Sequence, residues 1–115
     1  MRRGDVVWVD LDPTRGSEAN KRRPAVIVSN DGANRTALSL GRGVITVVPV
    51  TSNTSKVFPF QVLLPAKSCG LPKPSKAQAE QVRSVSVDRV SKPIGTVSRA
   101  LLGQLDDALR LHLAL

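Results

Sequence analysis

The sequence predicts a mainly β fold: a compact barrel or curled antiparallel sheet of five or six short strands, with one α-helix packed at the C-terminal end. Three observations predict it. Short β-branched runs alternate with turn residues as far as Val97. Sustained helical spacing of apolar residues is found after Ser98. With 115 residues the chain has the length of a single domain, 1–115, and buries enough apolar surface for one core.

The first two strands lie on either side of a polar, basic loop. A β-branched run with Trp8 inside it occupies 5–11 and is ended by Asp12-Pro13. The loop 13–23 follows and finishes with three consecutive cations. The second strand, 24–29, begins at a proline, and its four consecutive apolar residues indicate burial on both faces.

Four more strands are predicted, at 44–50, 58–64, 80–87 and 94–97. Pro49 places the end of the third strand at an edge or at the end of regular pairing, and Pro59 indicates that the fourth is an edge strand. Asn30-Asp31-Gly32 reads as a turn, and the polar stretch from there to Arg42 is given no regular structure. The segment 65–77, which contains one glycine and three prolines, is predicted to be a loop.

One helix is predicted, and it is the last element. Ser98 is suited to cap its N-terminus. A single apolar stripe then follows helical spacing: Leu101, Leu102, Leu105, Ala108, Leu109 and Leu113. Gly103 weakens this helix by ~1 kcal/mol relative to alanine. The stripe indicates a helix with one buried face.

Charge points to a polyanionic partner. The net charge is +8 and the isoelectric point is near 10.9. The chain between Asp31 and Glu80 holds no acid, and its cations are Arg35, Arg42, Lys56, Lys67, Lys73 and Lys76. This favours nucleic acid, although a basic protein can also be merely soluble. The three aromatic residues are too few for a single-strand binder built on several stacking platforms.

Several classes of protein are excluded or disfavoured. The single cysteine, Cys69, allows no internal disulfide and is read as incidental. No apolar run approaches the ~20 residues that span a bilayer, and the N-terminus lacks the apolar core of a signal peptide, so a cytoplasmic protein without a membrane anchor is expected. His112, the one histidine, is interpreted as a helix surface residue. No metal-ligand spacing or phosphate-binding glycine loop is present, so no metal or cofactor is predicted.

Two polar groups remain that could act on a phosphodiester: Glu18 with Arg22 and Arg23, and Thr51-Ser52 after the third strand. If the second and third strands are antiparallel neighbours, Arg23 faces Thr51 across one rim of the sheet. A guanidinium and a hydroxyl would then donate to the same phosphate oxygens. In RNA the 2′-hydroxyl is a built-in nucleophile, so attack needs no metal and leaves a 2′,3′-cyclic phosphate.

Each of these features also has a structural interpretation. A Thr-Ser pair after a strand commonly forms a turn by bonding its own backbone. A basic loop is commonly solvated, and Glu18 could simply pair with a neighbouring arginine. From composition and spacing alone, the sequence therefore predicts a basic, β-rich domain that binds nucleic acid.

An ordered set of motifs nevertheless resembles the MazF/PemK family of toxin endoribonucleases from bacterial toxin–antitoxin pairs. The motifs, which extend over nearly the whole chain, are 3–13, Gly16-Ser17-Glu18, 23–29, 48–52, 58–62 and 80–84. The resemblance implies an SH3-like β-barrel with a C-terminal helix. It also implies a homodimer that cleaves single-stranded RNA at short sequences without a metal, to leave a 2′,3′-cyclic phosphate and a 5′-hydroxyl.

The resemblance assigns catalysis to Arg23 and Thr51. It gives Glu18 and Gln81 supporting roles, and the other supporting or RNA-binding residues predicted are Ser52, Lys21, Arg22 and Lys56. Because arginine stays protonated in proteins, we assign Arg23 charge stabilisation, with proton donation to the leaving 5′-oxygen as an option. The implied protein partner is an antitoxin with an acidic, extended C-terminal segment.

The segments 31–42 and 65–77 depart from other family members, which leaves the recognised RNA sequence open. Two alternative functions are considered. One is a CcdB-like poison of DNA gyrase on the same fold, which the absence of any aromatic residue after Phe60 disfavours. The other is an RNA-binding module without catalysis, which would show salt-dependent binding and no RNA fragments.

Overall fold

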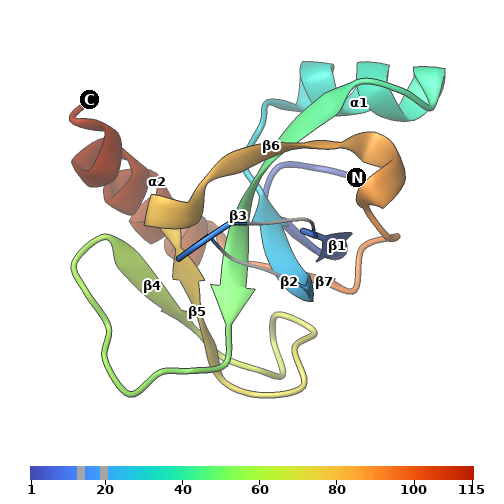
Figure 1. The fold of residues 1–115 in the computed structure, drawn as a ribbon. Coiled ribbons are helices and arrows are strands. Elements are labelled where there is room, and N and C mark those ends of the chain that lie inside the picture. The colour runs from blue at the N-terminus through green and yellow to red at the C-terminus, as the bar shows by residue number, and fades with distance from the viewer. Residues whose placement is uncertain (13–14, 19–20) are drawn as a thin grey trace.

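A curled antiparallel sheet with two helices at its margins forms the protein (Figure 1). The computed structural model describes residues 1–12, 15–18 and 21–115, so the predicted loop 13–23 is described only in part. The strands of the described chain are β1 (Asp5–Asp10), β2 (Arg22–Ile27), β3 (Val44–Thr51), β4 (Gln61–Leu64), β5 (Ser75–Gln78), β6 (Arg83–Ser86) and β7 (Gly95–Thr96). The helices are α1 (Asp31–Leu40) and α2 (Arg99–Leu113), with short 3-10 turns η1 (Ala79–Gln81) and η2 (Val87–Arg89).

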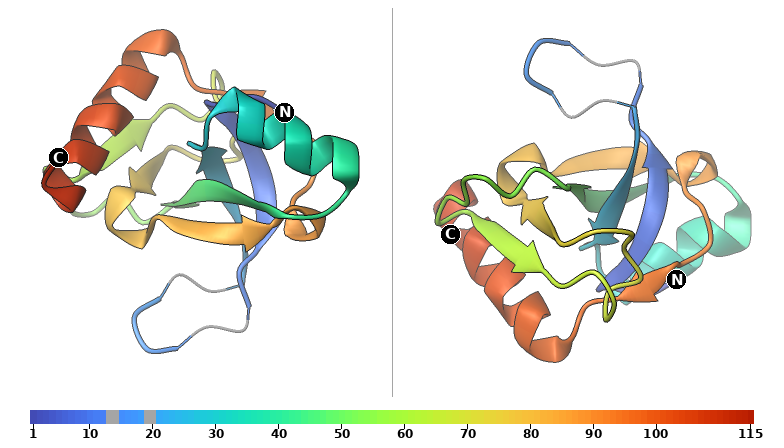
Figure 2. Two further views of the ribbon diagram at one scale, coloured as in Figure 1. Left: turned by 90° about the horizontal axis from the view of Figure 1, so that it is seen from above. Right: turned by 90° about the horizontal axis from the view of Figure 1, so that it is seen from below.

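Strand β3 is the centre of the sheet. The strand order is β4-β5-β3-β2-β1-β7, and β6 pairs with the first half of β3. The end of β3 pairs instead with β5, so β3 passes from one layer of the structure to the other and the sheet curls around it (Figure 2). The predicted antiparallel pairing of the second and third strands is confirmed, with Ala25 opposite Pro49 and Ile27 opposite Val47.

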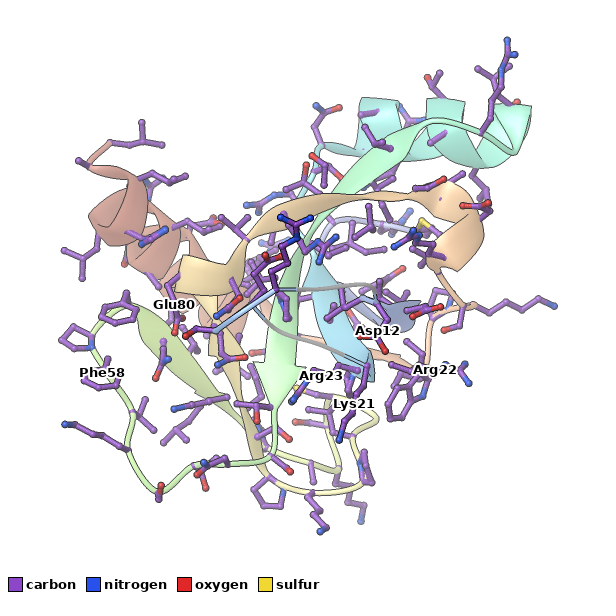
Figure 3. All side chains as sticks on the ribbon, in the orientation of Figure 1. Asp12, Lys21, Arg22, Arg23, Phe58 and Glu80 are labelled. Carbon is purple, nitrogen blue, oxygen red and sulfur yellow. The ribbon has the colours of Figure 1, made fainter. Side chains whose placement is uncertain are left out.

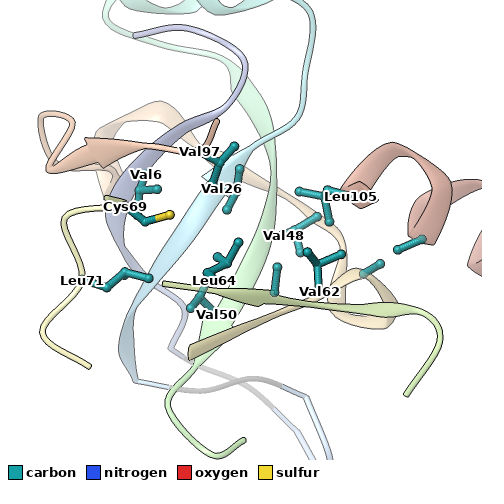
Figure 4. Close-up of a cluster of buried hydrophobic side chains, with 13 residues drawn as sticks. Val6, Val26, Val48, Val50, Val62, Leu64, Cys69, Leu71, Val97 and Leu105 are labelled. Atoms are coloured by element: carbon teal, nitrogen blue, oxygen red, sulfur yellow. The ribbon is translucent and has the colours of Figure 1, made fainter. Parts of the chain in front are cut away.

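The strands β1, β2 and β3 are buried on both faces, as the apolar run of the second strand predicted. Alternate residues face a core between the two layers of the sheet, where α2 also packs; it includes Val6, Val26, Val48 and Leu105 (Figure 4). The intervening residues face a second core beneath α1 and β6; it includes Val7, Ala25, Val47 and Val85. Two cores on one sheet hold the ends of β2 and β3 in fixed positions.

The predicted C-terminal helix is confirmed in position and orientation. Ser98 caps α2, since its hydroxyl accepts a hydrogen bond from the amide of Leu101 at 3.2 Å. Leu105 and Ala108 are buried against the first core, but Leu113 at the end of the stripe is 49% exposed. His112 is exposed, with its ring 6.5 Å from that of Phe60, which agrees with its interpretation as a surface residue.

The prediction of a turn and irregular chain from Asn30 to Arg42 was wrong, because this segment contains α1. Asn30 is the N-cap of the helix rather than part of a turn, and its side chain accepts from the amide of Ala33 at 2.8 Å. Gly41 ends the helix in the left-handed conformation. The buried face of α1 consists of Asn34 and Ala37, too small an apolar signal to stand out in the sequence.

Pro49 lies in the central strand rather than at an edge, but the β2–β3 register ends at it, which is the other alternative that the sequence predicted. Two strand assignments differ from the prediction. The predicted loop 65–77 contains the start of β5, and the predicted strand 80–87 is divided among η1, β6 and η2. The fourth strand is an edge strand, as predicted from Pro59, but begins only at Gln61. Neither helix of the described chain is long and apolar enough to cross a membrane.

Candidate active site

The candidate site lies where β2 begins and β3 ends. Arg23 is the second residue of β2 and Thr51 is the last residue of β3; both side chains are half-buried. The paired register ends at Ala25 and Pro49. If it were continued two residues further, it would set Arg23 opposite Thr51 on the same face of the sheet, which is the arrangement that the sequence predicts.

The hydroxyl of Thr51 forms part of a local turn. Its oxygen accepts a hydrogen bond from the backbone amide of Asn53 at 3.3 Å. This is the self-bonding turn that the structural interpretation of the Thr-Ser pair predicted. The bond uses the hydroxyl oxygen as acceptor, so the hydroxyl hydrogen can still be donated to a ligand. The turn and a phosphate-binding role are therefore compatible.

A pocket of about 330 Å³ opens on one side of this rim. The predicted site residues Lys21, Arg22, Arg23 and Ser52 all line it. The remaining lining residues are Trp8, Pro24, Val50, Pro72, Lys73 and Ser75. Every charged residue among the described lining residues is a cation, so the pocket has a positive potential suited to an anion.

Glu18 and Gln81 lie elsewhere, in a second hollow of about 220 Å³ that they share with Glu80, Val82 and Arg83. No described residue lines both hollows. The side-chain amide of Gln81 donates to the carbonyl of Ser17 at 3.1 Å and so ties the loop that carries Glu18 to η1. In Figure 3 the three cations gather at the start of β2, whereas Glu80 lies on the other side of β3.

Lys56 lies apart from both hollows, in the middle of the loop between β3 and β4. Its ammonium is 4.7 Å from the centre of the Phe58 ring, and Phe58 stacks on Phe60 at 5.3 Å. The backbone carbonyl of Lys56 accepts a hydrogen bond at 2.5 Å from the ammonium of Lys76, a residue that is only 8% exposed. Because Lys76 is the partner of Thr51 in the β3–β5 register, this bond ties the loop to the strand beside the site.

Sequence reasoning did not assign Trp8, Lys73 and Lys76 to the site. The signal for Trp8 was available: alternation along β1 puts it on the same face as Asp10, whose cross-strand partner is Arg22. The guanidinium of Arg22 indeed lies 5.6 Å from the centre of the Trp8 ring. Lys73 and Lys76 were seen only as part of the basic middle of the chain, because their segment was read as a loop.

Cys69 is fully buried in the core between the two layers, which agrees with a packing role. In the described ranges, no group of three or more His, Cys, Asp or Glu side chains is arranged to hold a metal ion.

Comparison with known proteins identifies the family. The model of the PemK-like, MazF-like toxin of type II toxin–antitoxin systems matches residues 2–113. The endoribonuclease MazF9 of Mycobacterium tuberculosis (strain ATCC 25618 / H37Rv) is 67% identical over 115 residues, which are 100% of this chain and 98% of that protein.

Solved structures agree on the fold. The crystal structure of MazF from Deinococcus radiodurans (Form-I) has a TM-score of 0.83 at 26% identity and covers 100% of this chain and 97% of its own. A mycobacterial endoribonuclease in complex with its cognate antitoxin has a TM-score of 0.77 at 23% identity, over 100% of this chain and 96% of its own. The predicted resemblance is thus confirmed: this chain belongs to the PemK-like, MazF-like toxin family of type II toxin–antitoxin systems.

Proposed function

We propose that this chain is a toxin endoribonuclease that cleaves single-stranded RNA without a metal, at a phosphate bound between Arg23 and Thr51. The observation that supports the proposal is the β2–β3 register, whose continuation would set Arg23 opposite Thr51 beside a cationic pocket that Arg23 lines. Membership of the toxin family and the 67% identity to an endoribonuclease support the reaction class.

In the proposed reaction, the 2′-oxygen of the substrate attacks the adjacent phosphorus and the bond to the 5′-oxygen breaks. The products are a 2′,3′-cyclic phosphate and a 5′-hydroxyl; the 2′-hydroxyl loses a proton and the 5′-oxygen gains one. Negative charge on the phosphoryl oxygens grows in the transition state. The planar fork of Arg23 and the hydroxyl of Thr51 would stabilise that charge by donating to these oxygens.

The supporting residues divide into two groups. Lys21, Arg22 and Ser52 line the pocket beside the rim and would hold RNA there. Glu18 and Gln81 would contact the substrate on the other side of β3, where the Gln81–Ser17 hydrogen bond fixes the loop.

Lys56 is in the middle of the loop that follows Thr51, where its ammonium lies over the ring of Phe58. It would guide the strand electrostatically rather than touch the reacting phosphate.

Two protein partners are proposed. A toxin of a toxin–antitoxin system has an antitoxin, and an acidic segment of it would complement the net charge of +8. A second copy of this chain is favoured by the exposed apolar residues at the end of α2, where Leu111 is 57% and Leu115 is 85% exposed. Sedimentation should therefore give twice the mass of the chain. An RNA substrate also implies a cytoplasmic protein.

The function is tested by incubating the protein with a defined RNA in EDTA and mapping both ends of each fragment. We expect cuts at a recurrent short motif, with cyclic-phosphate and 5′-hydroxyl ends. A folded protein that binds RNA in a salt-dependent way without cutting it would instead be a binding module. Cleavage that stops in EDTA would contradict the metal-independent reaction.

A further inference from the structure

The 330 Å³ pocket has one aromatic wall, formed by Trp8. Trp8 is half-buried and pairs with Pro24 across the β1–β2 ladder, so the ring is held on a rigid part of the sheet. The guanidinium of Arg22 covers part of it, 5.6 Å from the ring centre. A fixed indole beside a guanidinium plane is a surface on which a flat ring can stack.

The opposite wall comes from the segment between β4 and β5. Pro72 and Lys73, both exposed, line the pocket there, with the buried Ser75 below them. Lys73 adds a fourth cation to Lys21 and the two arginines of β2, and no carboxylate is among the described lining residues. The pocket therefore combines an aromatic wall with an anion-attracting rim.

The size and position of the pocket fit a single nucleotide. Its volume of about 330 Å³ is near the lower end of the ~300–1,000 Å³ typical of small-ligand sites. Arg23 and Ser52 line it too, so it opens directly beside the rim at which the scissile phosphate is proposed to lie. An acidic peptide would find cations here but would not need the aromatic wall, which favours a nucleotide.

We propose that this pocket is the subsite for the nucleotide next to the scissile phosphate of single-stranded RNA. The base adds to the stack of Trp8 and Arg22, and the phosphate on the far side of that nucleotide contacts Lys73. This proposal rests on the proposed function. It makes the Trp8 pocket a determinant of which base flanks the cut.

Binding is measured first, because Trp8 is the only tryptophan of the chain and its fluorescence reports this pocket alone. The probe is a single-stranded RNA with 2′-O-methyl groups, which cannot undergo 2′-hydroxyl attack. We expect the RNA to quench Trp8. Lys73→Glu should weaken binding about tenfold. Lys67→Glu, in the same loop but outside the pocket lining, is the matched control and should change affinity less than twofold.

Cleavage then identifies the position. A series of RNA substrates carries one ribose without a base at successive positions around the cut. In the wild-type protein, loss of the base at one position adjoining the cut should lower kcat/KM about tenfold. In Trp8→Leu that same loss should have no further effect, because the ring that the base stacks on is gone. Trp8→Phe retains an aromatic wall and should retain most of the effect.

The outcomes are distinguishable. Equal effects of base removal in the wild type and in folded Trp8→Leu, at every position, overturn the proposal. So does quenching of Trp8 by an antitoxin but not by RNA, which would assign the pocket to the antitoxin. If RNA quenches Trp8 and Lys73→Glu weakens this binding as expected while no RNA is cut, the subsite stands and the endoribonuclease function fails.

Discussion

Arg23 and Thr51 should behave as one unit in a double-mutant cycle. The perturbations are Arg23→Lys, which keeps the charge and removes the planar fork, and Thr51→Val, which keeps the shape and removes the hydroxyl. The β2–β3 ladder ends at Ala25 and Pro49, and its continuation would set Arg23 and Thr51 opposite each other on one face. In the proposed function, both side chains donate to the same phosphate there.

The magnitude follows from that shared target. Removing one preorganised donor from a developing oxyanion costs about 10²–10³ in turnover. Independent effects would multiply to about 10⁴–10⁶ in the double variant. Residues that hold the same phosphate are non-additive, so we expect the double variant to be no more than about tenfold worse than the poorer single variant.

The assay is single-turnover cleavage of one defined RNA, with affinity for a 2′-O-methyl RNA measured in parallel. Turnover should fall while affinity changes only a few-fold. Arg35→Lys is the control: Arg35 is an exposed residue of α1, distant from the rim in sequence and element. Multiplicative losses would refute the shared phosphate, and near-normal cleavage by Arg23→Lys would refute the bidentate role. If Thr51→Val fails to fold, Thr51 is structural.

Three further predictions concern stability and the surroundings of the site. Gly95→Ala should lower the free energy of unfolding in denaturant by about 3 kcal/mol or more, because the new Cβ would lie 2.2 Å from the carbonyl oxygen of Cys69. Gly103→Ala, at an exposed position of α2 with nothing within 4 Å of the new Cβ, should instead raise it by about 1 kcal/mol. Lys76→Met should free the loop after Thr51, because it removes a charge-assisted hydrogen bond worth about 1.5–3 kcal/mol. RNA turnover should therefore fall, whereas the melting temperature should change little because the substitution also removes a buried charge. Unchanged turnover would show that the Lys76–Lys56 bond does not position Thr51. A hydrogen bond from the Arg3 amide lowers the pKa of Asp31 below its ordinary value of 3.8. This carboxylate therefore stabilises the fold above pH 3.8, and its contribution is lost as the pH falls through the lowered pKa. Asp31→Asn should lose less stability than the wild type between about pH 5 and pH 2, and parallel curves of unfolding free energy against pH would contradict this.

The sequence predicted best where burial dictates the residues. The strands β1, β2 and β3 and the helix α2 carry strong apolar patterns, and each was predicted within a few residues. Helix α1 was missed because it buries only Asn34 and Ala37, so its pattern looks like a polar loop. Its ends were nevertheless encoded, by an asparagine cap and a left-handed glycine, which a reading based on apolar periodicity overlooks.

The candidate site was predictable only in part. The antiparallel pairing of the second and third strands, from which the expectation that Arg23 faces Thr51 follows, was predicted from the sequence and is confirmed. The division of the supporting residues between two hollows could not be predicted in this way, because it depends on where loops distant in sequence return to the sheet. Gln81 reaches Ser17 across 64 residues, and Lys73 reaches the pocket of Trp8 from another layer of the sheet. Charge alone did not single out Lys73 from the other cations.

The two prolines at the rim explain why the ladder between β2 and β3 stops there. Pro24 and Pro49 lack backbone amides, and the β2–β3 ladder ends at Ala25 and Pro49. Beyond that point the strands remain neighbours, held by two cores, but they no longer pair regularly with each other. The pocket lined by Arg23, Pro24 and Val50 opens where this ladder stops, so a ligand held in it would lie beside Arg23. In the proposed function, the prolines that end the ladder therefore leave room for the phosphate to be bound between Arg23 and Thr51.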